Sequence, residues 1–179
     1  MNPIIPFPSL YLPGIHGLAH AYRVLRLVQR ISEAEKASPA QRRILAFCAV
    51  FHDIGRVNDG KDPGHGFRSI TKLRDNGFFG LREFDTPLVH YIIENHCITD
   101  SSAFENVAKY AVAERDVAVL LLKMFKDADN LDRVRLGDFD GRYLRCAASR
   151  GLVEMAVNLF QEAVGEEEAV GVFEVILFK

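Results

Sequence analysis

The sequence has no excess of basic residues, since 22 Lys and Arg residues stand against 24 Asp and Glu residues and leave a net charge of −2. Proteins that bind a nucleic-acid backbone or an anionic membrane usually present a basic face. Polymeric nucleic acid is therefore not indicated as a partner. The sequence also has no apolar run that approaches the roughly 20 residues of a membrane-spanning helix. We therefore expect no membrane association.

Cysteine is scarce, and the three cysteines, Cys48, Cys97 and Cys146, have neither zinc-type nor redox-type spacing. This pattern argues for reduced, mostly buried thiols rather than disulfides. The N-terminus contains prolines at positions 3, 6, 8 and 13 and lacks the basic start and helical apolar core of a signal peptide. We therefore expect a cytoplasmic protein.

The overall composition, 49% hydrophobic and 26% charged, is that of an ordinary globular domain. Because prolines fix φ and remove backbone donors, we expect an extended arm over residues 1–14. A helical domain is expected over 15–165. The apolar tail, 166–179, is expected to pack on the domain or at an interface of a homo-oligomer. Its last ten residues are compatible with either a strand or a docking helix, and Glu166–Glu168 is expected to form a solvated turn.

Helical periodicity and end signals predict an all-α bundle in a single domain. Ser38, Pro39 and Gln41 form a capping box that starts a central, almost wholly apolar helix ending at Gly55. Thr86-Pro87 and the Ser102–Glu105 pair are predicted to start two further helices. The complete set of predicted helices covers residues 15–37, 38–55, 65–76, 86–96, 102–113, 116–135, 142–150 and 152–164.

An adjacent histidine and aspartate, His52-Asp53, close the central apolar helix. Similar side chains recur elsewhere along the chain, and the candidate metal ligands are His20, His52, Asp53, His65, His96 and Asp129. Their wide spacing places them on separate helices, so a site requires the helices to converge. Mixed imidazole and carboxylate ligands suit Mn, Fe, Co, Ni or Zn. Asp53 has two oxygens and is the natural bridge if a second ion joins the first.

The ordered motifs resemble those of the HD superfamily of metal-dependent phosphohydrolases. The resemblance covers about residues 16–135 and rests on His-Ala-Tyr-Arg-Val at His20, His-Asp-Ile-Gly-Arg at His52 and Ala-Asp-Asn-Leu-Asp at Asp129. It implies an HD-type helical bundle in which the counterparts of His20, His52, Asp53 and Asp129 bind the first metal. His65 and His96 resemble the additional ligands of two-metal relatives.

The sequence departs from the family pattern in two places. Cys97 follows His96 where the family often has a second histidine, and the Gly-Tyr-Pro signature of cyclic dinucleotide phosphodiesterases is absent. Both departures argue against that particular activity.

A metal ion bound at this site would favour phosphoester hydrolysis. It can lower the pKa of bound water to about 7, and its charge offsets the negative charge on the phosphoryl oxygens. Asp53 or a nearby histidine, His65, is the candidate proton acceptor. Arg56, Lys126 and Arg133 are the candidates for binding phosphate oxygens.

Several neighbouring residues have two interpretations. His16 lies one helical turn before His20, so it either faces substrate or metal or is a plain helix-terminal histidine. Asp127 and Asp132 either orient ligands or are exposed charges. Arg135 is expected to be solvated, and His90 is excluded from the site.

These observations predict a hydrolase for a small nucleotide or another small phosphoester, either a phosphomonoester or a phosphodiester. One metal ion is expected, with room for a second. Two alternatives remain open, a di-iron oxygenase on the same scaffold and a metal-stabilised nucleotide-binding module without turnover.

Overall fold

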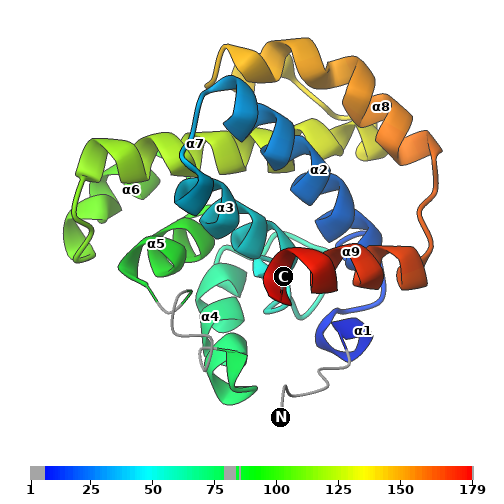
Figure 1. Cartoon of the computed structure of the whole chain (residues 1–179), viewed down its shortest axis with the longest axis horizontal. Helices are drawn as coiled ribbons and strands as arrows, with labels where there is room; N and C mark the ends of the chain where they lie inside the picture. The colour runs from blue at the N-terminus through cyan, green and yellow to red at the C-terminus, as the bar shows by residue number, and fades with distance from the viewer. Residues whose placement is uncertain (1–6, 79–83, 85, 179) are drawn as a thin grey trace.

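The structure is a computed structural model that describes residues 7–78, 84 and 86–178. As predicted, it is all-α, and no strand occurs in this described part of the chain. The centre consists of α2 (Leu18–Ala34), α3 (Pro39–Phe51), α5 (Pro87–Asn95) and α7 (Arg115–Leu131). α2 packs on α3 and α7, and α5 also contacts both. Figure 1 shows α7 crossing behind α2, with α3 below it in this view.

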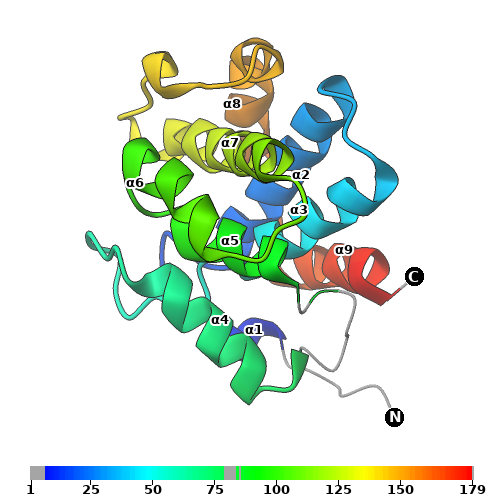
Figure 2. The same cartoon turned by 90° about the vertical axis from the view of Figure 1, so that its left-hand side faces the viewer.

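The remaining helices cover this centre. α4 (His65–Asp75) packs on α5, and Figure 2 shows it on the same side of the molecule as α1 (Phe7–Leu10). The other elements are α6 (Asp100–Glu105), α8 (Val153–Gln161), α9 (Glu166–Phe178) and the 3-10 helices Asn106–Lys109, Asp132–Leu136, Gly141–Tyr143 and Ala148–Leu152.

The apolar stripes of the central helices form the core. Leu25 of α2, Phe47 and Phe51 of α3, and Phe125 of α7 are fully buried. α3 is apolar on almost every side because it lies between α2, α5 and α7. This burial fixes the position of its C-terminal end, where His52 and Asp53 lie.

Capping signals in the sequence predicted several helix ends correctly. The Ser38 capping box is complete, and the hydroxyl of Thr86 accepts a hydrogen bond from the Val89 amide at 3.2 Å. Gly77, with φ of 73°, follows the end of α4 as a left-handed residue, which glycine adopts without steric cost.

Other predicted boundaries were wrong. α6 begins at Asp100 rather than Ser102, because Thr99 is its N-cap and the Ser102 hydroxyl hydrogen-bonds the Thr99 side chain. The helix predicted to reach residue 135 ends at Leu131 and continues as a 3-10 helix. The helix predicted over 142–150 is absent, and two short 3-10 helices occupy this region.

The two terminal segments are both partly helical. The segment predicted to be an extended arm contains α1, while its residues 1–6 lie outside the described part. The tail is helical, which is one of the two alternatives left open, and the exposed Glu166–Glu168 belong to the first turn of α9 rather than to a separate turn. Carboxylates in a first helical turn interact favourably with the helix dipole. α9 packs on α2 and α3 through Phe173, which is fully buried.

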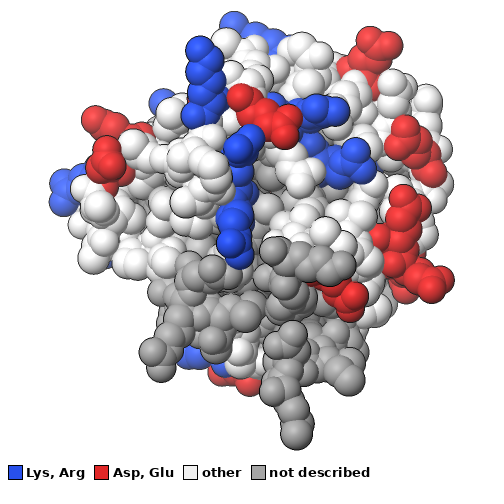
Figure 3. All heavy atoms as spheres, viewed as in Figure 1, with Lys and Arg blue, Asp and Glu red and all other residues white. Residues whose placement is uncertain are grey.

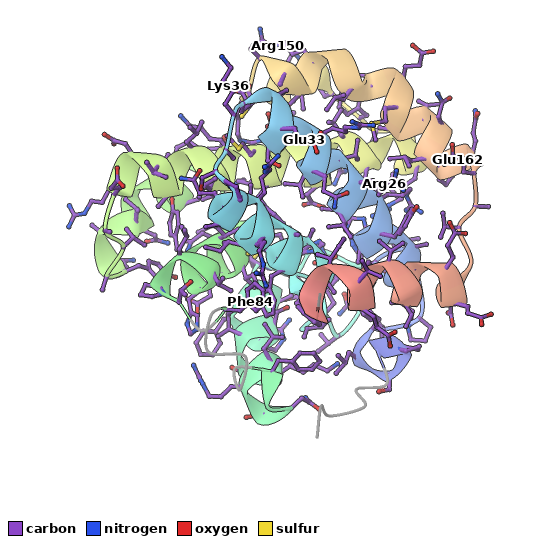
Figure 4. The ribbon with its side chains drawn as sticks, viewed as in Figure 1. Arg26, Glu33, Lys36, Phe84, Arg150 and Glu162 are labelled. Carbon is purple, nitrogen blue, oxygen red and sulfur yellow. The ribbon has the colours of Figure 1, made fainter. Side chains whose placement is uncertain are left out.

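The outer face of α2 and α3 carries charges of both signs. Figure 3 shows lysine and arginine side chains along the middle of this face, with acidic side chains between and beside them. Figure 4 places Arg26 and Glu33 on α2 and Lys36 in the following turn. Among the described residues, every helix is too short or too polar to cross a membrane.

Candidate metal centre

All six predicted metal ligands converge between the central helices and α4. His20 lies in the first turn of α2, and Asp129 lies in the last turn of α7. His52 and Asp53 follow directly after α3. His65 is the first residue of α4, and His96 follows α5.

We define the first group as the side chains of His20, His52 and Asp129 together with one carboxylate oxygen of Asp53. Asp53 Oδ2 lies 3.4 Å from His20 Nε2 and 3.6 Å from His52 Nε2. Asp129 Oδ1 lies 3.4 Å from His20 Nε2 and 4.0 Å from His52 Nε2. Two imidazole nitrogens and two carboxylate oxygens therefore surround one point.

We define the second group as the side chains of His65 and His96 together with the other carboxylate oxygen of Asp53. Asp53 Oδ1 lies 2.9 Å from His65 Nε2 and 3.5 Å from His96 Nε2. Although Oδ1 is buried, it makes no hydrogen bond. A single aspartate thus joins the two groups.

Each of the four imidazoles has its Nδ1 atom next to a hydrogen-bond acceptor. His52, His65 and His96 place Nδ1 at 3.0, 2.5 and 2.7 Å from the carbonyl oxygens of Ala49, Asp62 and Ile93. His20 places Nδ1 2.7 Å from a carboxylate oxygen of Asp132. With the Nδ1 proton donated to these acceptors, the Nε2 lone pairs point into the centre.

The close approach of these lone pairs fits a bound cation. His20 Nε2 and His52 Nε2 are 3.2 Å apart, and His65 Nε2 and His96 Nε2 are 2.7 Å apart. Two lone pairs repel each other unless a proton or a cation lies between them. The donor set and the buried Asp53 Oδ1 without a hydrogen bond both suit a divalent transition metal.

The electrostatics of the first group also favour a positive charge. Burial lowers the pKa of His52 to about 3, so this imidazole is neutral. Burial disfavours the charged form of His20, but contacts with Asp129, Asp132 and Asp53 outweigh it and raise the pKa of His20 well above its usual value. The Asp129 side chain is 35% exposed at the cavity, and although desolvation opposes it, contact with His20 holds the pKa of this carboxyl below its usual range. The carboxylates are therefore ionised, as metal ligands must be.

Two glycines allow the helices to approach closely enough to form the second group. A Cβ atom on Gly55 would lie 2.2 Å from the Ser69 amide nitrogen of α4. A Cβ on Gly66 would lie 2.3 Å from the Ile93 carbonyl oxygen of α5. Gly55 therefore seats α4 against the end of α3, and Gly66 seats α4 against α5, which brings His65 next to His96.

Asp132 occupies the orienting position that the sequence had left open. It is fully buried, contacts His20 Nδ1, and receives Arg23 Nε at 2.5 Å and Arg135 Nε at 2.7 Å. Arg135 was predicted to be solvated, but its side chain is only 6% exposed because it pairs with Asp132.

Asp127 has a different role. Its carboxylate accepts hydrogen bonds from the backbone amides of Arg145 and Cys146. It therefore fixes the chain segment that follows the 3-10 helix Gly141–Tyr143, and the structure gives it no contact with the six histidine and aspartate side chains.

A cavity of about 750 Å³ opens onto the centre. All four residues predicted to contact substrate line it, namely His16, Arg56, Lys126 and Arg133. His16 Nδ1 lies 2.8 Å from Asp53 Oδ2, and Arg56 Nε lies 3.1 Å from the same oxygen. His90 is not among the described residues that line this cavity.

Lys126 and Arg133 are engaged by neighbouring acids. Lys126 Nζ lies 2.8 Å from Asp100 Oδ1 and donates to the Ile98 carbonyl, whereas the half-exposed Arg133 pairs with Asp138. Burial lowers the pKa of Lys126, although Asp100 opposes this shift.

Sequence reasoning missed several residues of the cavity wall, among them Asn130, Tyr143 and Arg145. Arg145 binds Asp100 through two nitrogens at 2.8 Å, and the exposed Tyr143 lies two residues before it in the sequence. Asn130 lines the cavity with a buried side-chain nitrogen that has no hydrogen-bond partner. Only Asn130 carried a usable signal, since it directly follows Asp129.

Comparison with known proteins agrees with this geometry. The HD domain family matches residues 17–134, which is more than half of the chain and includes all six converging residues. His16, Tyr143 and Arg145 lie outside the matched segment. Neither a search of curated proteins nor a search of solved structures found a match. From the family match and the arrangement of its histidines and aspartates, the chain belongs to the HD domain family.

Proposed function

We propose that the protein is a metal-dependent phosphohydrolase for a small nucleotide or another small phosphoester. The observation that carries this proposal is the position of Asp53, whose two oxygens each face a different pair of imidazole Nε2 atoms. His20, His52, Asp53 and Asp129 would hold one divalent ion. His65 and His96 would hold a second ion together with Asp53. Mn, Fe, Co, Ni and Zn are the metals that this ligand set suits.

A divalent ion supplies such a site with activated water at neutral pH and with positive charge toward the phosphoryl oxygens. Asp53 and His65 are the candidate proton acceptors, because both present basic atoms beside the cavity. The buried surroundings of Asp53 strengthen its interactions with charged neighbours, since little water screens them.

Arg56 is the candidate with the best position for binding phosphate. Its side chain is 12% exposed, lines the cavity and lies beside Asp53. Its Nη1 donates to the Gly60 carbonyl, which fixes the guanidinium at the rim. Lys126, Arg133 and His16 extend the positive and hydrogen-bonding surface of the wall.

The cavity also accommodates an apolar part of a substrate. Ile15, Leu136 and Tyr143 are exposed apolar side chains that line it. An apolar rim above a polar floor is typical of sites that bind a small organic molecule. This supports a phosphoester with an organic group rather than inorganic phosphate compounds.

The test is metal analysis of the purified protein followed by phosphate release from a panel of phosphomonoesters and phosphodiesters. We expect bound transition metal and hydrolysis that Asp53→Asn removes. Asp75→Asn, at the exposed end of α4, is the matched control and should retain hydrolysis. A protein without transition metal whose hydrolysis is unchanged by Asp53→Asn would refute the proposal.

The same measurements separate the alternatives. Stoichiometric iron with substrate-dependent oxygen uptake and no phosphate release would identify an oxygenase. The histidine-rich first and second groups also suit two iron ions. A nucleotide that raises the melting temperature without being consumed would identify a binding module.

A further inference from the structure

We propose that Cys97 completes the second group as a thiolate ligand, so that this group prefers a thiophilic divalent ion such as Zn²⁺ to Mn²⁺ or Mg²⁺. This inference rests on the proposed function only in requiring that the second group binds metal. It concerns which ion binds there and which atom selects it.

The position of the Cys97 sulfur supports this assignment. Potential ligand atoms of Cys97, His65 and His96 all lie within 4.8 Å of one another. Cys97 lines the cavity, whereas Cys48 and Cys146 are buried elsewhere in the core. The neighbouring side chain of Asp53 is only 2% exposed, and its Oδ1 faces the same histidines without a hydrogen bond.

The sulfur makes a weak hydrogen bond that a metal ion can replace. Cys97 Sγ donates a hydrogen bond to the Pro63 carbonyl at 3.2 Å, and a thiol is a weak donor. A small shift of the side chain replaces this contact with a bond to an ion between the two imidazoles. Binding releases the thiol proton to the buffer, so sulfur enters as the thiolate.

The two groups would then differ in chemical character. The first group offers two nitrogens and two carboxylate oxygens, a set that accepts Mn or Fe. The second offers two nitrogens, the shared Asp53 oxygen and one sulfur, and soft thiolate ligands select zinc over manganese or magnesium. One protein would therefore bind two different ions.

Cobalt reports thiolate ligation directly, because a cobalt–thiolate bond gives a near-ultraviolet charge-transfer band. The metal-stripped full-length protein is titrated with Co²⁺. We expect this band in the wild-type protein and its loss in Cys97→Ser. Cys97→His should still bind two equivalents of Co²⁺, but without the band. Cys146→Ala is the matched control, and it should keep the band because Cys146 lies away from the cavity.

A second measurement does not depend on any variant. Iodoacetamide alkylation of wild-type Cys97, followed by mass spectrometry, should be suppressed by Zn²⁺ and much less by Mn²⁺. Equal alkylation with and without Zn²⁺, a wild-type protein without the band, or a Cys97→Ser protein that keeps it would each overturn the proposal. If hydrolysis and first-group metal binding persist in those cases, the phosphohydrolase assignment stands while the thiolate ligand fails.

Discussion

Asp132 acts on the metal centre without facing it. Its carboxylate fixes the Nδ1 atom of His20, and Arg23 and Arg135 hold that carboxylate in place. The pKa of Asp132 is below its usual range, because His20 and Arg23 outweigh the effect of burial. The charge on Asp132 in turn makes the His20 imidazole more basic.

We therefore predict that Asp132→Asn weakens metal binding by roughly 10-fold to 100-fold, as substitutions of such supporting residues do. It should also lower the free energy of unfolding by about 3–5 kcal/mol, because Arg23 and Arg135 lose their buried partner. Competition with a chromophoric chelator measures affinity, and urea denaturation measures stability. Asp138→Asn, on an exposed loop, should change neither quantity. A metal affinity of the Asp132→Asn protein equal to that of the wild-type protein would contradict the role of Asp132 in supporting His20.

The sequence identified the residues that face the centre, but it left open whether Asp132 orients a ligand and gave Arg135 as solvated. His52 and Asp53 stand out because a polar pair closes an apolar helix. The contact between Asp132 and His20 joins residues 112 positions apart, and no local pattern encodes it. Arg135 likewise has the sequence context of a surface residue and is buried only because its partner is buried.

At the scale of secondary structure, close contacts between helices set the distance between ligands. α4 reaches the centre through Gly55 and Gly66, neither of which leaves space for a side chain. The sequence alone suggested that Gly55 ends α3, whereas the helix ends at Phe51 and Gly55 serves packing against α4. Capping boxes predict where a helix begins, but they do not say which helices touch.

We predict that Gly66→Ala lowers the free energy of unfolding by about 1–3 kcal/mol, the usual cost of overpacking. It should also weaken metal binding to the second group, since the added methyl group displaces α4 from α5. Calorimetry of metal titration and denaturant unfolding test both effects. Gly171→Ala is the control, because its Cβ position has no atom within 4 Å beyond the adjacent residues and the backbone of α9 itself. That substitution should stabilise α9 by about 0.5–1 kcal/mol.

The ambiguity of the tail has a physical reason. An apolar stretch of this length suits either a strand or a buried helix, and periodicity does not distinguish them. The first turn of α9 contains three glutamates, which favour a helix N-terminus, and α2 and α3 supply the apolar surface on which it packs. The choice between helix and strand for the tail therefore depends on the surface of α2 and α3 on which the tail packs.

At the scale of the whole molecule, α9 contributes to stability and not to the metal centre. Phe173 is fully buried against the helices that carry His20 and His52, while Val175 is 51% exposed. We predict that Phe173→Ala lowers the free energy of unfolding by about 3–5 kcal/mol, the usual cost of truncating a core phenylalanine. Val175→Ala should have little effect. Metal affinity should be unchanged in both folded variants, and a change in Phe173→Ala would show that α9 also shapes the centre.

The metal centre joins α2, α3, α4, α5 and α7, so a bound ion links most of the central helices. Without an ion, only protons can separate the facing imidazole nitrogens. We predict that chelation lowers the melting temperature of the wild-type protein, and that Zn²⁺ or Mn²⁺ restores it. An ion present at 100 times its dissociation constant raises the free energy of unfolding by about 2.7 kcal/mol. For a chain of this size, that corresponds to a rise in melting temperature of roughly 5–10 °C.

The Asp53→Asn variant should show a much smaller change in melting temperature, because it loses the carboxylate shared by both groups. A wild-type melting temperature that does not depend on metal would show that these histidines are held in place by the fold alone.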